Sequence, residues 1–446
     1  MARSPTKRVN VAVSRIIPPI LLGVVIYASY VVTKPLCIDY LFYPKQYYNR
    51  SPQVGAGVAI LVIYYILLIF LIATYLRLLY NVVWDPGYLP RGAQCLQAQE
   101  EGHAKGHRRR RHRRKGGRKG TKETEKADGS ELDLERGLEY DIGGMAFPLD
   151  NAGLESFYTK DVFVCQPDGR PPYCSSCCQF KTDRTHHCRE VERCVRKMDH
   201  YCPWVGGVVS ETSFKFFIQF VFYTAVYCIF ALIVTAYYTA QLKRSTGRIN
   251  AHWAVGIGLS AFFGIFSFSM TISAVQLSSQ NLTTIENLSR RSAVWTLAIR
   301  IPEHLLSKLN PDSESSWAPT FATISYPLTP TPPSQETQNK PSPSNQRHVF
   351  AILQTQPGEN PFDLGSWTKN LQQVMGFSVA EWLLPFKQSP CANHSSLESA
   401  FALGPVVDRL KRDAGLEPGP MPEEDSSKRE GHERKKRRKH RRHRRS

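Results

Sequence analysis

The sequence predicts an α-helical integral membrane protein with four transmembrane helices and a cysteine-rich domain between helices 2 and 3. Two observations lead to this fold class. Four apolar stretches are each long enough to cross the hydrocarbon core of a bilayer, which takes ~20 helical residues. Seven of the eleven cysteines fall between Cys165 and Cys202. Uncharged apolar runs of such length exclude an ordinary soluble protein.

The basic charge of the chain is concentrated in two tracts. The 446 residues include 57 Lys and Arg against 38 Asp and Glu, a formal net charge of +19. His103 to Lys122 holds eleven basic residues and no acid, and Lys428 to Arg445 holds twelve against two acids. The remainder carries 34 basic and 36 acidic residues. Two low-complexity runs on a nearly neutral chain disfavour a nucleic-acid-coating protein, so no nucleic-acid partner is expected.

Each predicted span is an uncharged apolar run. The four are Ile16 to Thr33, Gly55 to Leu76, Phe216 to Gln241 and Trp253 to Val275. The first follows several basic residues, as a signal sequence does. Its apolar run is too long for a signal-peptide core, however, and no small-residue cleavage site follows, so it is predicted to be retained.

Charge and cysteine use together predict the orientation. Lys and Arg near span ends favour the cytosol, and both the N-terminus and the segment beginning at Arg77 are basic or lead to basic sequence. The loops 34–54 and 242–252 also carry basic residues, so charge alone gives a small preference. A cysteine cluster outside disulfides suits a reducing cytosol. Both termini and the cysteine-rich loop are therefore expected to be cytosolic.

Five consecutive parts are expected along the chain. They are an N-terminal tail and first hairpin (1–76), a cytosolic loop (77–164), the cysteine-rich domain (165–215), a second hairpin (216–275) and a cytosolic tail (276–446). Residues 98–135 have the composition of a disordered insert, and Pro327 to Ser344 that of a linker. Aromatic and turn residues over 360–386 predict either a small ordered element at the membrane interface or an aromatic loop.

The cysteine-rich loop predicts a zinc site. Cys174-x2-Cys177 followed by His and Cys pairs is typical of zinc, because four thiolate or imidazole donors suit a tetrahedral ion and fix a loop too polar to build a core. One four-ligand site is the minimum, and Cys174 and Cys177 are its predicted ligands. The residues that compete for the other positions are His186, His187, Cys178, Cys188 and Cys194. The alternative is a set of unligated cysteines.

Cys202 lies apart from that knuckle. It follows Asp199 and His200 and precedes Pro203-Trp204, just before the third span. A thiol becomes a nucleophile when a neighbouring imidazole favours the thiolate and a carboxylate orients the ring. The residue types fit this arrangement. From these residues alone, further zinc ligation by His200 and Cys202 is the stronger interpretation.

Several motifs, in order along the chain, carry a family resemblance. The runs Arg184-Thr-His-His-Cys and Cys194-Val-Arg-Lys-Met-Asp-His-Tyr-Cys-Pro-Trp resemble the cysteine-rich domain of the DHHC protein S-acyltransferases, or palmitoyltransferases. Three further motifs match: Asp85-Pro-Gly after the second span, Thr283-Thr-Ile-Glu after the fourth, and Asn360-Pro-Phe-Asp-Leu-Gly in the tail. The Asp-His-Tyr-Cys form is similar to a fungal branch with Tyr in place of the second His. The two basic tracts lie outside the resemblance.

The resemblance implies roles for individual residues. It makes Cys202 the acyl-accepting nucleophile, His200 its base and Asp199 the residue that orients His200. It also assigns one structural zinc to Cys174, Cys177, His187 and Cys194. Thr283, Thr284 and Glu286 are expected to brace the catalytic loop, and Asp85 and Gly87 to form a turn that ends the second span.

A second zinc site of the family is not expected here. It would use Cys188 and three positions that hold Val191, Tyr201 and Val208 in this chain. Because one ligand cannot hold a zinc ion, we predict a single zinc. The hypothesis for this region is that Val191, Tyr201 and Val208 form an apolar cluster in place of the metal. The stretch after Trp204, from Gly206 to Ser210, also diverges from the family.

The implied reaction is two-step transfer of a long-chain acyl group. Palmitoyl-CoA is the expected donor, and cysteines of substrate proteins on the cytosolic side are the acceptors. The basic residues Lys181, Arg184, Arg196 and Lys197 are candidates for CoA phosphates or for a solvated face. The basic tracts are expected to attract anionic lipids, and the location to be an endomembrane or the plasma membrane. The alternatives are a zinc-braced membrane adaptor without catalysis and a zinc-finger ubiquitin ligase, which needs two interleaved metal sites.

Overall fold

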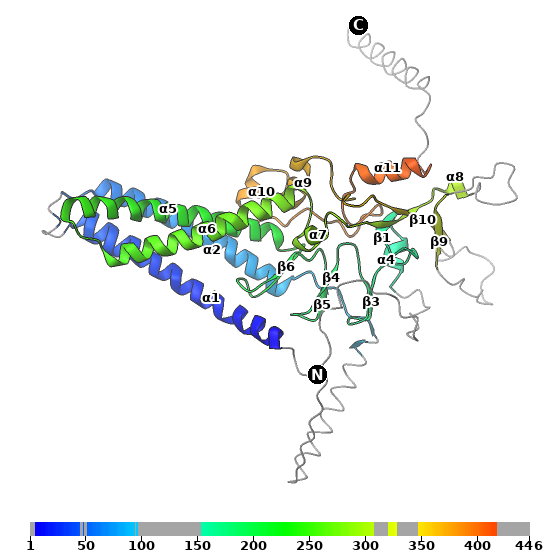
Figure 1. The fold of residues 1–446 in the computed structure, drawn as a ribbon, viewed down its shortest axis with the longest axis horizontal. Coiled ribbons are helices and arrows are strands. Elements are labelled where there is room, and N and C mark those ends of the chain that lie inside the picture. Colours follow the sequence, from blue (N-terminus) through cyan, green and yellow to red (C-terminus); the bar gives the residue numbers. More distant parts are fainter. Residues whose placement is uncertain are drawn as a thin grey trace, which may run out of the picture.

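The computed structural model describes residues 5–44, 48, 51–93, 95–96, 153–306, 320–327 and 347–416. Four long helices form a bundle at one end of the molecule, and short strands and helices gather at the other end (Figure 1). The two basic tracts, the expected insert over 98–135 and the linker beyond Pro327 lie outside the described residues.

Each predicted span falls within one long helix. These are α1 Pro5–Val31, continued by the π-helix η1 Val32–Phe42, then α2 Val54–Trp84, α5 Phe214–Thr246 and α6 Ala251–Ser279. All four are long and apolar enough to cross a membrane, which confirms the fold class and indicates a multi-pass membrane protein. The helices outlast the predicted spans because backbone hydrogen bonds continue beyond the apolar core.

The first span differs most from its prediction. Its helix does not end at Thr33 but continues as η1 to Phe42. Leu36 is fully buried, and the ring of Tyr40 packs edge-on against Trp253 of α6 with 5.0 Å between ring centroids. Packing of these side chains stabilises helical backbone in a segment that was expected to be loop.

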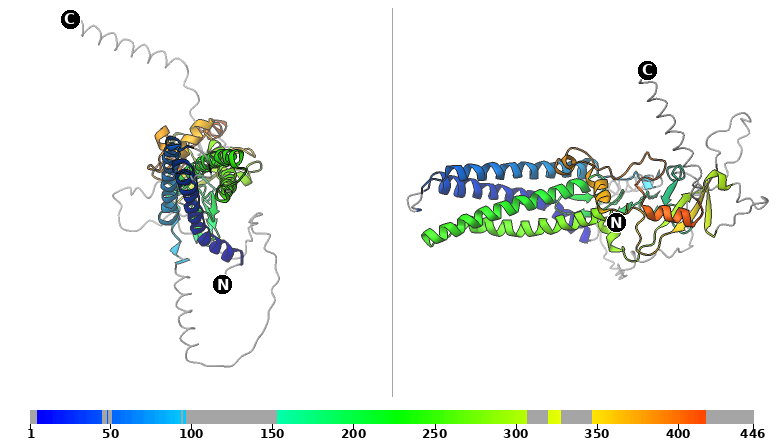
Figure 2. Two further views of the ribbon diagram at one scale, coloured as in Figure 1. Left: turned by 90° about the vertical axis from the view of Figure 1, so that its left-hand side faces the viewer. Right: turned by 90° about the horizontal axis from the view of Figure 1, so that it is seen from above.

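Small residues let α6 approach α5 closely. Gly256, Ser260, Gly264 and Ser267 recur about one turn apart on the buried face of α6. A Cβ atom added at Gly264 would lie 3.3 Å from the Cβ atom of Cys228 on α5. Small residues of this kind are what helix packing in membranes requires. The end-on view in Figure 2 shows α1 diverging from the other helices toward its N-terminal end.

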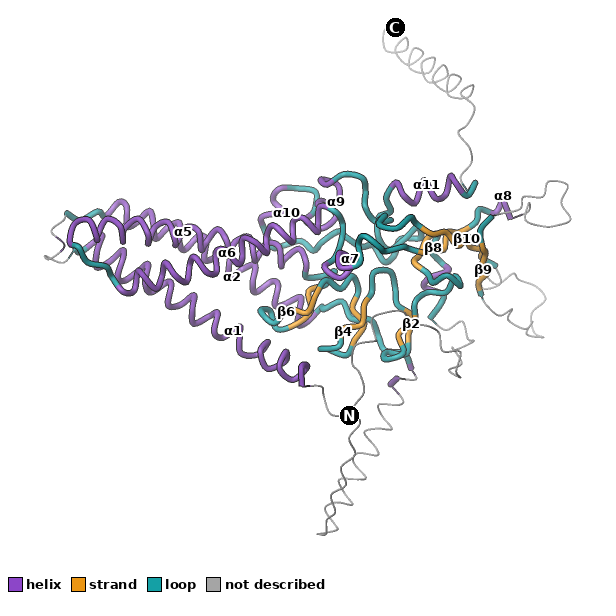
Figure 3. The backbone as a smooth tube through the Cα atoms, viewed as in Figure 1, coloured by secondary structure: helices purple, strands orange, loops and turns teal. Residues whose placement is uncertain are grey.

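The cysteine-rich domain consists of three two-stranded hairpins that succeed one another along the molecule (Figure 3). They pair β2 Tyr173–Cys174 with β3 Gln179–Phe180, β4 His186–Cys188 with β5 Arg193–Val195, and β6 His200–Cys202 with β7 Gly207–Val209. His187 lies opposite Cys194, and Cys202 lies opposite Gly207. Each hairpin therefore presents Cys or His side chains at defined positions.

The turn predicted after α2 is confirmed. Asp85 follows the last residue of α2, and Gly87 has a φ of +71°, a conformation that favours glycine. The chain then pairs with β5: Arg196 N donates to Gly87 O at 2.9 Å, and Leu89 N donates to Cys194 O at 2.9 Å. This motif thus also fastens the cysteine-rich domain to the end of α2.

A four-stranded antiparallel sheet is present that the sequence reasoning did not predict. Its order is β1 Val162–Val164, β8 Thr296–Arg300, β10 His348–Gln354 and β9 Ala322–Tyr326. It joins the expected cytosolic loop to the expected tail. Phe163, Tyr326 and Phe350 pack on one face, and Leu297, Ile299 and Val407 contribute to a cluster on the other.

Short helices complete this region. They are α4 Glu155–Tyr158, α7 Thr284–Leu288, α8 Glu303–Leu306, α9 Trp367–Met375, α10 Val379–Leu383 and α11 Pro405–Asp413. The segment expected to be ordered over 360–386 contains α9 and α10, so it is not a simple loop. Val374 and Met375 of α9 pack in the same buried cluster as Phe217 of α5.

Candidate active site

Four side chains converge between the first two hairpins of the cysteine-rich domain. The donor atoms of Cys174, Cys177, His187 and Cys194 all lie within 4.8 Å of one another. Nδ1 of His187 is 3.5 Å from Sγ of Cys174, 3.4 Å from Sγ of Cys177 and 3.9 Å from Sγ of Cys194. Ligands of a tetrahedral zinc with bonds of ~2.0–2.3 Å are separated by about 3.5–3.8 Å. This group can therefore hold a metal ion with zinc-like geometry.

The other candidate ligands are not part of this group. Cys178 bonds to the carbonyl of Ser175 at 3.4 Å, and Cys188 is buried in an apolar cluster. Burial raises the pKa of the Cys188 thiol to about 11, which favours the neutral thiol over the thiolate that metals require. Among the residues that the structure describes, these four are the only group of His, Cys, Asp or Glu side chains close enough together to hold a metal ion.

The positions of the missing second site form an apolar cluster. Cys188, Val195, Met198 and Val208 are buried together, and Tyr88, Val191, Tyr201 and Ile285 pack against them. Tyr201 of β6 lies opposite Val208 of β7. The hypothesis that Val191, Tyr201 and Val208 pack together is confirmed. Packing contacts therefore hold the β6–β7 hairpin at the positions for which the resemblance implied metal ligands.

Asp199, His200 and Cys202 come together at this hairpin. His200 Nδ1 lies 2.6 Å from Asp199 Oδ2, and Cys202, two residues along β6, is 4% exposed. The ring of His200 packs edge-on against Phe217 of α5 with centroids 5.2 Å apart. Burial disfavours the charged ring, but the hydrogen bond to Asp199 and the nearby Cys202 outweigh it and raise the pKa of His200 to about 10. Proton transfer from a thiol to this imidazole is favoured.

Thr284 fixes the carboxylate of Asp199. Its backbone N–H donates to Oδ1 and its Oγ1–H donates to Oδ2, each at 2.9 Å. The sequence predicted only that the Thr-Thr-x-Glu motif braces the loop, and did not predict this direct contact. The position of Thr284 within that motif was the one available signal.

Glu286 and Arg184 form a buried brace beneath this contact. Arg184 donates from Nε to Oε1 at 2.7 Å and from Nη2 to Oε2 at 2.6 Å, and its side chain is fully buried. Thr283 caps α7 through reciprocal bonds with Glu286. The guanidinium of Arg184 also lies 4.8 Å from the ring centroid of Phe362. The predicted bracing role of the motif is confirmed.

Two of the basic residues predicted for CoA phosphates or a solvated face were wrongly interpreted. Arg184 is 4% exposed and Lys197 is 5% exposed, because both side chains extend into the protein. Arg196 is partly exposed, with Nε 3.6 Å from Oε1 of Glu211. Alternating charges in the sequence did not reveal which side chains point inward.

An apolar cavity opens beside Cys202 and leads between the helices. It has a volume of about 300 Å³ and is lined by His200, Cys202, Trp204 and apolar residues of α1, α5 and α6. A second apolar cavity of about 150 Å³ continues among α1, α2, α5 and α6. The two share Leu21, Phe220, Thr224 and Phe263. The two cavities are therefore adjacent, and Cys202 lines the first of them.

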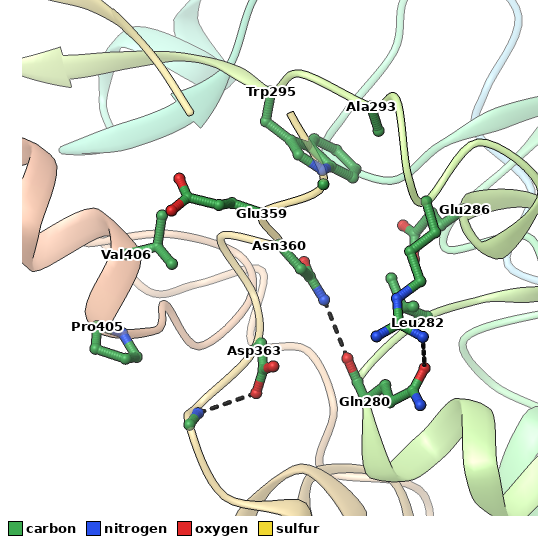
Figure 4. A pocket seen from close by; sticks show the side chains of 13 residues that line it. Gln280, Leu282, Glu286, Ala293, Trp295, Glu359, Asn360, Asp363, Pro405 and Val406 are labelled. Atoms are coloured by element: carbon green, nitrogen blue, oxygen red, sulfur yellow. Dashed lines mark hydrogen bonds between the residues drawn. The ribbon is translucent and has the colours of Figure 1, made fainter. Parts of the chain in front are cut away.

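A cavity of about 220 Å³, lined by both polar and apolar side chains, lies beside Glu286 of the Thr-Thr-x-Glu motif (Figure 4). Its lining includes Glu286 but neither His200 nor Cys202. Across it, Asn360 Nδ2 donates to Gln280 O at 3.1 Å, which ties the tail motif to the end of α6 (Figure 4). This cavity is part of the scaffold that positions α7.

Comparison with known proteins agrees with these features. Residues 168–291 match the family model described as DHHC palmitoyltransferase. Palmitoyltransferase pfa5 of Aspergillus fumigatus is 67% identical to this chain over 93% of both chains. The chain belongs to the DHHC palmitoyltransferase family.

Other members of the DHHC palmitoyltransferase family match as well. Palmitoyltransferase pfa5 of Emericella nidulans is 58% identical over 94% of this chain and 89% of its own length. Palmitoyltransferase PFA3 of Kluyveromyces lactis is 37% identical over 51% of this chain and 56% of its own. The chain is a protein S-palmitoyltransferase of the fungal branch, as the sequence resemblance indicated.

Proposed function

We propose that this palmitoyltransferase moves a long-chain acyl group from palmitoyl-CoA, through a thioester on Cys202, to cysteines of substrate proteins. One observation carries the proposal: the thiol of Cys202 lies where the Asp199–His200 pair meets the apolar cavity. Acid–base groups and space for an acyl chain therefore converge on one nucleophile.

The chemistry balances in two steps. His200 takes the proton of Cys202, and the thiolate attacks the thioester carbonyl of palmitoyl-CoA. The bond between the carbonyl and the CoA sulfur breaks, and CoA leaves with a proton from His200. In the second step His200 takes the proton of a substrate cysteine, whose thiolate attacks the acyl carbonyl; the bond to the Cys202 sulfur breaks, and Cys202 regains a proton from His200. Each step exchanges one thioester for another, so no external energy source is needed.

The cavity supports the choice of a long acyl chain. Each methylene removed from water contributes about 0.8 kcal/mol. Phe220 and Phe263 line both parts of the cavity, so a chain attached at Cys202 would run between α1, α5 and α6. The soluble CoA portion would remain outside the helices.

A zinc ion bound by Cys174, Cys177, His187 and Cys194 would be structural. With all four positions filled by protein, such an ion has no site for water or substrate and acts by cross-linking β2–β3 to β4–β5. The apolar cluster around Val208 makes a second ion unnecessary. We therefore propose one zinc per chain, and nothing observed favours the catalytically impaired adaptor.

The membrane arrangement is a further part of the proposal. We propose that both termini and the active site face the cytosol, in an endomembrane or the plasma membrane, with both basic tracts on anionic lipids. Tyr223 Oη donates to Leu383 O at 2.9 Å, so α10 lies against the membrane-spanning α5. Phe377 and Phe386, beside α10, are exposed and would enter the lipid interface.

The division of the chain at residues 76, 164, 215 and 275 also remains a proposal. One element is added to it: β1 of the loop and β8 to β10 of the tail form a single sheet. The cysteine-rich domain would thus be held from both sides, by the membrane helices and by this sheet.

Labelling of purified protein with radioactive palmitoyl-CoA tests the proposal. Hydroxylamine-sensitive label is expected on wild type and on Cys178→Ser, which removes a partly exposed thiol outside the metal group. No label is expected on Cys202→Ser. Equal labelling of Cys202→Ser and wild type would refute Cys202 as the nucleophile.

A further inference from the structure

The deeper apolar cavity reaches the outside of the helix bundle. Leu22 of α1 and Ile72 of α2 line this cavity of about 150 Å³, and they are also 61% and 43% exposed. A residue that lines a cavity and is exposed as well lies at the rim of that cavity. Because the two rim residues belong to α1 and α2, the cavity opens between these two helices.

The opening is a crevice that is closed at one end. There, Ser29 Oγ of α1 lies 3.1 Å from Tyr64 Oη of α2. Along their length, α1 packs on α6 and η1, and α2 packs on α5 and η1, whereas α1 and α2 are not a closely packed pair within the described residues. Figure 2 shows α1 diverging from the other helices toward its N-terminal end. The two helices therefore separate from the contact at Ser29 toward the cysteine-rich domain.

The other end of the crevice lies close to the nucleophile. Tyr75 of α2 lines the deeper cavity, and its Oη donates to Trp204 O at 3.4 Å, two residues after Cys202. Leu21 of α1 lines both this cavity and the one that Cys202 lines. A chain that enters the crevice sideways would thus lie next to the cavity of Cys202.

Two prolines weaken α1 at the level of the crevice. Pro18 and Pro19 lie inside α1, and Pro18 lines the deeper cavity. Proline has no backbone N–H, so neither residue can donate the hydrogen bond to the preceding turn that a helix normally has there. Helices bend most readily at such positions. The N-terminal part of α1 can therefore bend at the crevice without breaking further hydrogen bonds.

We propose that the crevice between α1 and α2 is a lateral portal through which the acyl chain of a membrane-dissolved acyl-CoA enters the cavity beside Cys202. The inference rests on the proposed function and specifies the route of the donor. Both helices are long and apolar enough to span a bilayer, so the crevice would face lipid hydrocarbon. A chain that moves from lipid into an apolar cavity exposes no methylene group to water, whereas endwise entry from the cytosol would first expose the whole chain.

A lateral portal and a closed cavity differ in the donors that they accept. With a portal, the far end of the acyl chain can remain in the lipid, so a bulky group at that end is tolerated. In a cavity that is closed toward the lipid, such a group would have to fit among packed side chains of the bundle, where close packing leaves no room.

The test compares two donors in full-length protein reconstituted into lipid nanodiscs: palmitoyl-CoA and an acyl-CoA whose chain ends in a pyrene group. In wild type, single-turnover acylation of Cys202 should proceed at rates within about threefold for the two donors. In Ile72→Trp, which narrows the rim, both should react about tenfold more slowly, whereas octanoyl-CoA, with a chain half as long, should change less than about threefold. Ile69→Trp is the matched control and should resemble wild type, because Ile69 lies on the same helix, is 64% exposed and is outside the cavity lining.

Other results would overturn the inference. If wild type reacts with palmitoyl-CoA but not with the pyrene donor, the cavity is closed toward the lipid. Equal rates in Ile72→Trp and Ile69→Trp would exclude a portal at this rim. If Ile72→Trp does not accumulate, Leu22→Trp narrows the opposite rim and must give the same selective loss. Absence of Cys202-dependent label from palmitoyl-CoA on wild type would instead refute the proposed function itself.

Discussion

Replacing Asp199 by Asn should make acyl-enzyme formation slow and dependent on pH. Asn is isosteric and can still accept one hydrogen bond from Thr284, but its amide cannot stabilise a charged His200. Burial lowers the pKa of His200, and the bond to Asp199 is the largest contribution that raises it to about 10. Without that bond, the pKa of His200 should fall, because burial is then opposed only by the remaining contribution of the nearby Cys202.

The magnitude follows from the size of this shift. If the pKa of His200 falls by about two units, the proton transfer from Cys202 to His200 becomes less favourable by ~2.7 kcal/mol, which is about 100-fold in its equilibrium constant. We therefore expect autoacylation at pH 7 to fall about 100-fold. His200 of wild type should add no titration limb between pH 6 and 8, because its pKa of about 10 lies above that range. The variant should acquire one.

Single-turnover autoacylation with labelled palmitoyl-CoA, measured at several pH values, provides the assay. Asp161→Asn is a matched control, because Asp161 is a half-exposed carboxylate paired with Arg300 outside the active site. A loss below about threefold in Asp199→Asn, or a profile as flat as that of wild type, would refute the assigned role of Asp199.

Three further predictions concern the brace, the metal and the cavity. Glu286→Gln leaves the buried guanidinium of Arg184 without its counter-charge and should lower the free energy of unfolding by about 3–5 kcal/mol, measured by denaturation in detergent. Elemental analysis should find one zinc per chain in wild type and in Cys188→Ser, and none in His187→Ala. Ala28→Phe narrows the deeper cavity and should shift acyl preference toward shorter chains, measured by competition between acyl-CoAs of different length.

Each of these predictions has a control and a contradicting result. Glu359→Gln disrupts the partly exposed pair with Arg409 and should cost at most about 1 kcal/mol, so equal losses in both variants would contradict the buried-brace argument. Two zinc ions per chain would contradict the replacement of the second site by packing. An unchanged chain-length preference in Ala28→Phe would show that the acyl chain does not reach α1 at that depth.

Features with a local signal could be predicted from the sequence. The four spans are uncharged apolar runs, and the knuckle at Cys174 and Cys177 has the spacing of zinc ligands. Choosing His187 and Cys194 as the other two ligands needed the family resemblance, because spacing alone left five candidates. The structure brings those four residues together. The replacement of the second metal site by apolar side chains could also be predicted from the sequence, since three of its four ligand positions differ from the family pattern.

Features that depend on long-range packing could not be predicted. The sheet pairs Val162 of β1 with Ile299 of β8, across both membrane helices of the second hairpin, and β1 is only three residues long. The side chain of Lys197 is buried because the backbone turns at that residue, and the pattern of charges in the sequence does not predict this turn. The bond from Thr284 to Asp199 joins residues far apart in sequence.

The most direct test of the central claim is peptide mass spectrometry of wild-type protein after brief incubation with palmitoyl-CoA. The account predicts one hydroxylamine-labile palmitoyl group, on the peptide that contains Cys202, and its loss when a substrate protein with a free cysteine is added. Palmitate found only on another cysteine, with Cys202 unmodified, would contradict it.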